Sequence, residues 1–195
     1  MTESAQSATR RRTRQAIIDA AASVLVRSPE APLAEIAAAA ETSRSTLHRS
    51  FADRAELIEA VVHDSIAAIT AATNRAAVDE GTPVEALRRV VTAYLEIGDR
   101  IRFLFADPTF AARHPAIAEL SAEEGPVIGL IARGQAEGSL DPACPPDWIE
   151  RTIWALVYTA SEAIDDGSLT RHAAPATLLQ TIEHGILRTA VGDAG

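Results

Sequence analysis

A run of short polar and cationic side chains surrounds one apolar residue in the segment 43–50. The run consists of Ser43, Arg44, Ser45, Thr46, His48 and Arg49, and it encloses Leu47. Arginine donates two hydrogen bonds at once to a guanine edge, and hydroxyl groups reach base edges or phosphates. The chemistry available here is hydrogen bonding and charge pairing with a polyanion such as DNA. An ordinary polar helix face is the alternative.

A second group of cations precedes this segment. Arg10, Arg11, Arg12 and Arg14 lie within five residues of one another, which suits contact with phosphates or with a minor groove. The chain carries a net charge of −9, but residues 1–54 hold eight arginines against six acidic residues. Because like charges repel DNA, the acidic remainder must lie away from any bound phosphates. The charge asymmetry predicts a small DNA-facing part and a larger body.

The elements that position these residues follow from periodicity and helix breakers. An amphipathic helix is predicted from about residue 9 to 27, after a disordered arm at 1–8. Pro29 and Pro32 separate it from a short helix at 33–40, and Ser43 caps a third short helix. Two short helices joined by a tight turn are typical of a helix-turn-helix, with Ile36, Leu47 and Phe51 fixing their angle.

The rest of the chain also predicts helices. They are expected at 53–78, 83–105, a short segment after Asp107, 114–137 with a break at Gly125, 147–166 and 175–191. The fold class is therefore all-α, with about nine helices. We expect a DNA-binding domain at residues 1–54 and a helical domain at 55–195, with the fourth helix shared between them.

Several function classes lack their signals. The five histidines show no metal-ligand spacing, Cys144 is the single cysteine and has no nearby histidine, and no glycine-rich phosphate loop occurs. We therefore expect no metal, no cofactor and no enzymatic activity. Every long apolar stretch is interrupted by charge, so no membrane span is expected. The cytoplasm is the expected compartment.

Residues 13–62 closely resemble the DNA-binding domain of the TetR family. The stretch TRQAIIDAAASVL resembles the family's first helix, LAEIAAAA its second, SRSTLHRSF its recognition helix and ADRAELIEAVV the start of its fourth. The resemblance implies a ligand-responsive repressor that binds a palindromic operator as a homodimer. It assigns Arg44, Ser45, Thr46, His48 and Arg49 to DNA, and Arg54 to a phosphate.

Three positions depart from the family pattern. Glu41 stands where the turn usually has glycine, His48 where tyrosine is usual, and Ser50 where histidine is usual. A left-handed backbone at Glu41 costs about 1 kcal/mol or more, and its carboxylate repels phosphates. These departures keep one alternative open, a helical effector-binding or scaffold protein whose DNA-binding head is impaired.

The resemblance further implies that helices four to seven enclose an effector pocket. Its candidate liners are Ile66, Ile69, Val91, Tyr94, Phe103, Phe110, Ile128, Ile131, Trp154 and Tyr158. Plain core is the alternative for each. The aromatic residues gather between Tyr94 and Tyr158, which favours an apolar or planar effector over a highly charged one. Arg100 and Arg102 are either partners for an acidic ligand or solvated.

The last two predicted helices are implied to form the dimer interface with their symmetry mates. The candidate interface residues are Ile153, Leu156, Val157, Ala160, Ile164, Leu179, Ile182 and Ile186. These stripes equally suit the core of a single chain, which remains the alternative. A twofold dimer is also what a palindromic operator requires.

Overall fold

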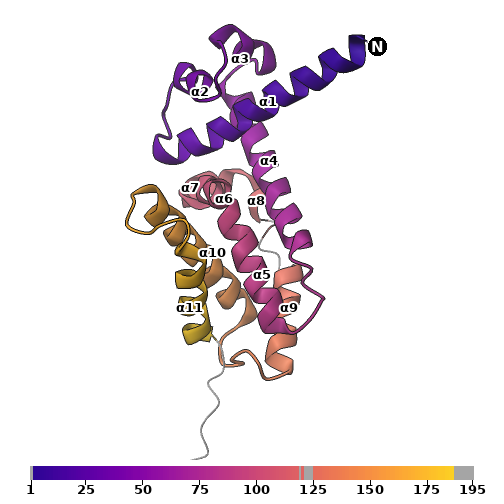
Figure 1. Cartoon of the computed structure of the whole chain (residues 1–195), viewed down its shortest axis with the longest axis vertical. Helices are drawn as coiled ribbons and strands as arrows, with labels where there is room; N and C mark the ends of the chain where they lie inside the picture. Colours follow the sequence, from indigo (N-terminus) through magenta and orange to yellow (C-terminus); the bar gives the residue numbers. More distant parts are fainter. Residues whose placement is uncertain (1, 119, 121–124, 187–195) are drawn as a thin grey trace, which may run out of the picture.

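The computed structural model describes residues 2–118, 120 and 125–186, and in these ranges the chain forms eleven helices and no β-strand (Figure 1). The helices are α1 (Thr2–Arg27), α2 (Leu33–Ala39), α3 (Arg44–Ser50), α4 (Arg54–Arg75), α5 (Pro83–Glu96), α6 (Gly98–Phe105), α7 (Pro108–Arg113), α8 (Pro115–Ala118), α9 (Pro126–Ala136), α10 (Pro146–Asp165) and α11 (Ala174–Ile186). The all-α prediction is confirmed, whereas the helix count was too low.

The first helix begins earlier than the sequence indicated. Helix α1 starts at Thr2, so residues 2–8 continue the helix and do not form a disordered arm. No proline or glycine occurs among these residues, and alanine, glutamate and glutamine favour helix. The apolar periodicity begins only further along, which is why the pattern placed the start near residue 9.

A single helix expected at 83–105 is in fact two. Thr82 caps α5 through a capping box with Glu85, as a Thr-Pro start favours. The chain then turns at Ile97, and α6 begins at Gly98. A Cβ atom placed on Gly98 would lie 1.9 Å from the Ser161 hydroxyl of α10. The absence of a side chain at Gly98 therefore allows α6 to approach α10 closely.

The buried apolar residues form two separate clusters. The first joins α1, α2 and α3 to the start of α4 and ends at Val61. The second begins at Val62 and extends through α5, α6, α9 and α10 to Ile182 on α11. The core of the DNA-binding part thus continues beyond residue 54, and α4 belongs to both parts. Phe103 of α6 contacts both clusters.

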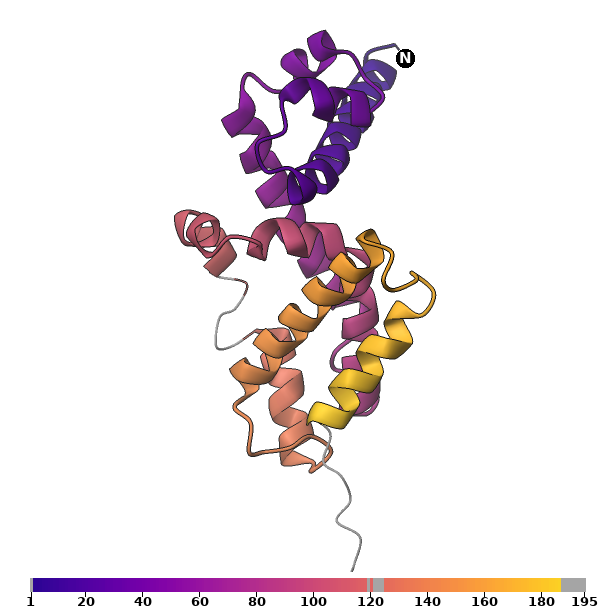
Figure 2. The ribbon, with the colours of Figure 1, turned by 90° about the vertical axis from the view of Figure 1, so that its left-hand side faces the viewer.

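Helix α6 lies between the two parts. Figures 1 and 2 show α1–α3 at one end of the molecule and the other helices at the opposite end, with α4 running between them. Helix α6 contacts α1, α4 and α10. Arg100 of α6 forms ion pairs with both Asp19 of α1 and Asp64 of α4, and Gln15 of α1 donates to both carboxylates. A polar cluster therefore joins the head, formed by α1–α3 and the start of α4, to the body, formed by the rest of α4 and the helices that follow it.

Candidate DNA-binding and effector sites

The first turn of α3 is held by hydroxyl groups. The Ser43 hydroxyl accepts a hydrogen bond from the Thr46 amide at 3.1 Å, which confirms the predicted cap. It also lies 2.9 Å from the hydroxyls of Ser45 and Thr46. Arg49 donates to the Thr46 hydroxyl at 2.9 Å. These contacts join four of the polar side chains into one hydrogen-bonded group.

Two apolar residues orient α3 on the head. Leu47 is fully buried and Phe51 is 1% exposed, so the opposite side of the helix faces outward. The outward residues are Ser43, Arg44, Ser45, His48 and Arg49, which are exposed, and Thr46, which is half-buried. The structure therefore places all six polar residues of the sequence-predicted segment on or near one outer surface.

The turn before α3 carries the backbone conformation that the sequence predicted. Glu41 has a φ of +50°, in the left-handed region that favours glycine. Thr42 nevertheless closes the turn, since its amide donates to the Ala37 carbonyl at 2.9 Å. Glu41 is exposed next to the polar surface of α3. The turn thus combines backbone strain with a negative charge on the outer surface.

The arginines of α1 flank α3 across a groove of about 750 Å³. Arg10, Arg11 and Arg14 line one side of this groove, and Thr46 and Arg49 line the other. Arg12 is exposed, and its guanidinium lies 3.5 Å from the Thr9 hydroxyl. The groove therefore has cations on both walls, as a bound phosphodiester chain requires.

Two predicted contact residues have partners within the protein. The Arg14 guanidinium carbon lies 4.3 Å from the centre of the Phe51 ring, where it helps to hold α3 against α1. Arg54 donates to the carbonyl oxygens of Pro29 and Ala31. Two donors of Arg54 therefore fix the loop before α2, and the phosphate contact that the resemblance implied stays a prediction.

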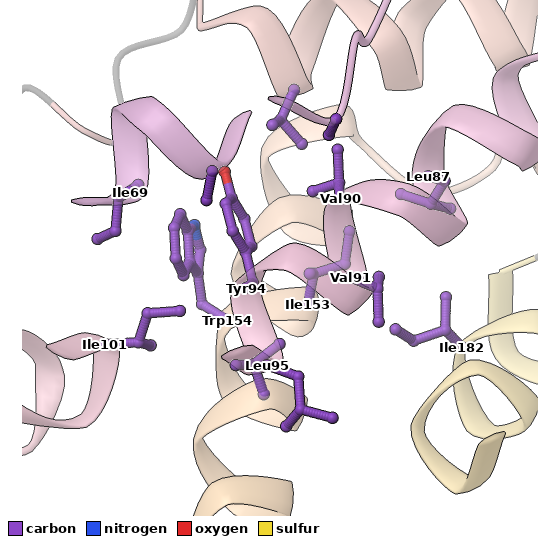
Figure 3. Close-up of a cluster of buried hydrophobic side chains, with 14 of the residues drawn as sticks. Ile69, Leu87, Val90, Val91, Tyr94, Leu95, Ile101, Ile153, Trp154 and Ile182 are labelled. Atoms are coloured by element: carbon purple, nitrogen blue, oxygen red, sulfur yellow. The ribbon is translucent and has the colours of Figure 1, made fainter. Parts of the chain in front are cut away.

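An aromatic cluster occupies the centre of the body. The rings of Tyr94 and Trp154 are stacked with centroids 4.5 Å apart (Figure 3). The centroid of the Phe105 ring lies 5.4 Å from that of Trp154. The Tyr94 hydroxyl lies 2.8 Å from the Thr73 hydroxyl of α4. Burial raises the pKa of Tyr94 to about 12. Helices α4, α5, α6 and α10 therefore meet at one aromatic cluster.

The predicted effector liners fall into three groups. Ile69, Val91, Tyr94, Ile131 and Trp154 are buried in the body core, whereas Ile66 and Ile128 are half-buried. Phe103 and Phe110 pack edge to face, with centroids 5.3 Å apart, and line a separate hollow beneath α1. Tyr158 and Trp154 line an open hollow of about 520 Å³ on α10, together with Phe105, Arg151, Ala155 and Thr159.

Arg100 and Arg102, for which the sequence allowed either a ligand contact or solvation, both form ion pairs within the protein. Arg102 is 6% exposed and forms ion pairs with Asp165 and, at 3.9 Å, with Asp99. Arg100 is shared by Asp19 and Asp64, as described above. Neither arginine is therefore a solvated residue or a free partner for an acidic ligand.

One buried acidic residue on α10 was not predicted from the sequence. Glu150 on α10 is 4% exposed, and burial raises its pKa to about 7 although Arg151 acts in the opposite direction. Glu150 precedes Trp154 by one helical turn, so both side chains lie on the same face of α10. The sequence signal for Glu150 was this four-residue spacing from Trp154, which places an acidic residue on the apolar stripe of the helix.

The prediction for the dimer interface needs correction. Ile153, Val157, Ala160 and Ile182 are all 7% exposed or less within a single chain, so they have almost no area left to bury against a second copy. These four residues belong to the core of one chain, which was the alternative. Leu156, Ile164 and Leu179 are half-buried, and the side chain of Ile186 lies outside the described residues.

The outer face of α10 carries other residues instead. Trp148 is 63% exposed, and Ala155 and Thr159 are exposed further along the helix. An exposed tryptophan is the kind of residue that protein interfaces bury. Helical periodicity in the sequence marks the apolar stripe that faces inward, and it gives no signal for this exposed side of the helix.

Comparisons with known proteins agree with this architecture. Residues 17–61 match the family described as bacterial regulatory proteins, tetR family. The chain is 35% identical, over 94% of its length and 95% of the relative's, to the HTH-type transcriptional repressor LfrR of Mycolicibacterium smegmatis. It is 26% identical to the HTH-type transcriptional regulator NfxB of Pseudomonas aeruginosa, over 87% of its length and 91% of the relative's.

A solved structure shows the same fold. The crystal structure of LfrR in complex with proflavine superimposes with a TM-score of 0.70 at 33% identity, covering 91% of this chain and 99% of that one. The chain therefore belongs to the TetR family of bacterial transcriptional regulators. Members of this family are DNA-binding regulators and not enzymes, as the sequence led us to expect. No helix in the described ranges is long and apolar enough to cross a membrane.

Proposed function

We propose that the protein is a repressor that binds a palindromic operator as a homodimer and is released by a small planar effector. The observation that carries the proposal is the outer surface of α3, where Arg44, His48 and Arg49 are exposed around a capped first turn. Helix α3 would enter the major groove, and the arginines of α1 would contact the adjacent backbone. Such a protein acts on chromosomal DNA, so the cytoplasm is the proposed compartment.

A palindromic operator requires two such heads in one particle. The exposed face of α10, with Trp148, Ala155 and Thr159, and the half-buried Leu179 of α11 offer a surface for a second copy. A twofold axis there would set the two α3 helices roughly 34–36 Å apart, one turn of DNA.

The proposed effector site is the aromatic cluster around Trp154. The relative LfrR was crystallised with proflavine, a flat tricyclic molecule, which supports a planar effector for this chain. Because α6 contacts the head and α10 alike, separation of the aromatic rings would move α6 and α4. A coupling of about 1–3 kcal/mol would lower operator affinity roughly 5- to 150-fold.

Selection from a pool of random duplex DNA tests the proposal. The purified protein should retain a palindromic site, and Arg44→Ala and Thr46→Ala should lose it. Arg75→Ala, at the opposite end of α4, changes charge equally with Arg44→Ala but lies away from α3 and serves as the control. Loss of the site with the control variant would contradict a role for α3.

One alternative has an observation of its own. The exposed carboxylate and left-handed backbone of Glu41 favour a weakened head, as in an effector-binding or scaffold protein. Diffuse binding that disappears with salt, with no recovered palindrome, would favour that alternative.

A further inference from the structure

Glu150 is a buried residue whose carboxylate oxygens keep a small contact with solvent but have no partner among the described residues. No hydrogen bond or ion pair joins it to any group in the part of the chain that the structure describes, although it is only 4% exposed. Buried ionisable groups in proteins are normally paired, because an unpaired buried charge costs several kcal/mol. Arg151 offsets this burial only in part, since its side chain is 71% exposed and its guanidinium lies 3.9 Å from Asp147.

Two aromatic side chains lie near Glu150. Trp154 follows one turn later on α10 and is stacked on Tyr94, and the charge of Glu150 acts on the Tyr94 hydroxyl. The indole nitrogen of Trp154 is also buried without a hydrogen-bond partner. On its outer side, Trp154 borders the open hollow that Phe105 and Tyr158 line. An unpartnered carboxylate, an unpartnered indole nitrogen and two aromatic ring faces thus occur close together.

We propose that the Glu150 carboxylate and the Tyr94–Trp154 ring pair bind a planar organic cation, which separates the two rings. Ring faces attract cations, and a buried carboxylate strengthens that attraction while gaining the partner it lacks. A planar anion would meet the same carboxylate and be rejected. The inference rests on the proposed function and specifies the chemical class of the effector.

The two tryptophans of the chain allow a direct measurement. In a Trp148→Phe background, which removes the exposed tryptophan and keeps an aromatic ring on the proposed dimer face, the fluorescence of Trp154 alone reports ligand binding. The probe is proflavine at pH 8, and acridine, the same tricycle without amino groups, is the uncharged comparison. We expect quenching of Trp154 by both compounds and tighter binding of proflavine.

Glu150→Gln isolates the contribution of the charge. In this variant the Kd of proflavine should rise about tenfold or more, whereas the Kd of acridine should change less than about twofold. Glu150→Asp should retain the preference for proflavine. Glu162→Gln, which removes an exposed carboxylate from the same helix, should bind both compounds like the wild type. A thermal melt of each variant establishes that it is folded.

The outcomes separate this inference from the proposed function. Proflavine that does not bind, or that binds equally to wild type and Glu150→Gln, overturns the inference. If, in the second case, proflavine still releases the selected DNA site, the proposed function stands without Glu150. Binding that depends on Glu150 but leaves DNA affinity unchanged supports the cation site and overturns the proposed ligand response.

Discussion

At the scale of single residues, the role of a polar side chain depends on whether it is exposed, bonded within the protein or buried. Ser43 and Arg44 can be recognised from the sequence because both are exposed. Packing does not restrict the type of an exposed residue, so its type indicates its chemistry. Arg54 and Glu150 depend on partners or burial set by residues distant in sequence. The sequence alone does not show whether a charged residue on an apolar stripe is buried or exposed, because this depends on which helices pack against the stripe.

Glu41 carries two separable costs, and substitution distinguishes them. Glu41→Gly should raise the free energy of unfolding by about 0.5–1 kcal/mol, because glycine tolerates a φ of +50° but loses more entropy on folding. Glu41→Gln removes the charge and keeps the strain. Both variants should bind DNA more tightly at low salt, whereas only the glycine variant should be more stable in urea denaturation. Equal stability of all three proteins would contradict the strain.

Glu150 should make stability depend on pH. Burial raises its pKa from 4.5 to about 7 in the folded chain, so between these values the folded protein retains a proton that the unfolded chain releases. Stability from this group is therefore greatest below pH 4.5 and falls as pH rises through 7, by up to roughly 3 kcal/mol.

Glu150→Gln should abolish most of this fall. Its stability advantage over the wild type, measured by urea denaturation, should be small at pH 5 and approach about 3 kcal/mol at pH 8. An advantage of the same size at both pH values would argue against ionisation of Glu150 as the cause.

At the scale of helices, the boundaries set by proline, glycine and caps were predictable, and those set by tertiary contacts were not. Thr82 and Pro83 mark the start of α5, and Gly125 precedes α9, as expected. The break before Gly98 depends on Ser161, which lies in a different helix. The inward stripe of α10 was recognised, but periodicity cannot tell the core of one chain from an interface between two.

The contact between α6 and α10 should tolerate no added atom. In Gly98→Ala, the new Cβ would lie 1.9 Å from the hydroxyl and 2.8 Å from the Cβ of Ser161, so we expect a loss of about 1–3 kcal/mol in chemical denaturation. Gly129→Ala on α9 is the matched control, because its Cβ meets nothing within 4 Å. That variant should gain about 0.5–1 kcal/mol through helix propensity. If Gly98→Ala unfolds with the same free energy as the wild type, α6 can move away from α10 without a cost in stability.

At the scale of the whole molecule, the division into head and body follows from two apolar clusters that meet within α4. The charge asymmetry of the sequence indicated this division, since the acidic residues gather after residue 54. The junction itself was not predictable, because Val61 and Val62 are adjacent and equally apolar yet belong to different clusters. Helical rotation between neighbouring residues separates them.

The proposed dimer gives a prediction at this scale. Ala155→Glu places a charge on the exposed face of α10 and should shift the protein from dimer to monomer in sedimentation velocity. Affinity for a palindromic site should fall on the order of 100-fold, because the two heads would no longer bind as one unit. Thr92→Glu, on the exposed face of α5, should remain dimeric. A dimeric Ala155→Glu protein would place the interface elsewhere.

Because α1 is one continuous helix, a movement of its later half also moves its earlier half. Its later half is held by α6, where Arg100 pairs with Asp19 and Ser23 donates to Asp99, and its earlier half carries Arg10 beside α3. Arg10 lies roughly 13 Å along the helix from Asp19 at 1.5 Å per residue. A tilt of about 10° at the α6 contact would thus move Arg10 by about 2 Å, close to the length of a hydrogen bond. A small rotation inside the body is therefore enlarged at the surface that faces DNA.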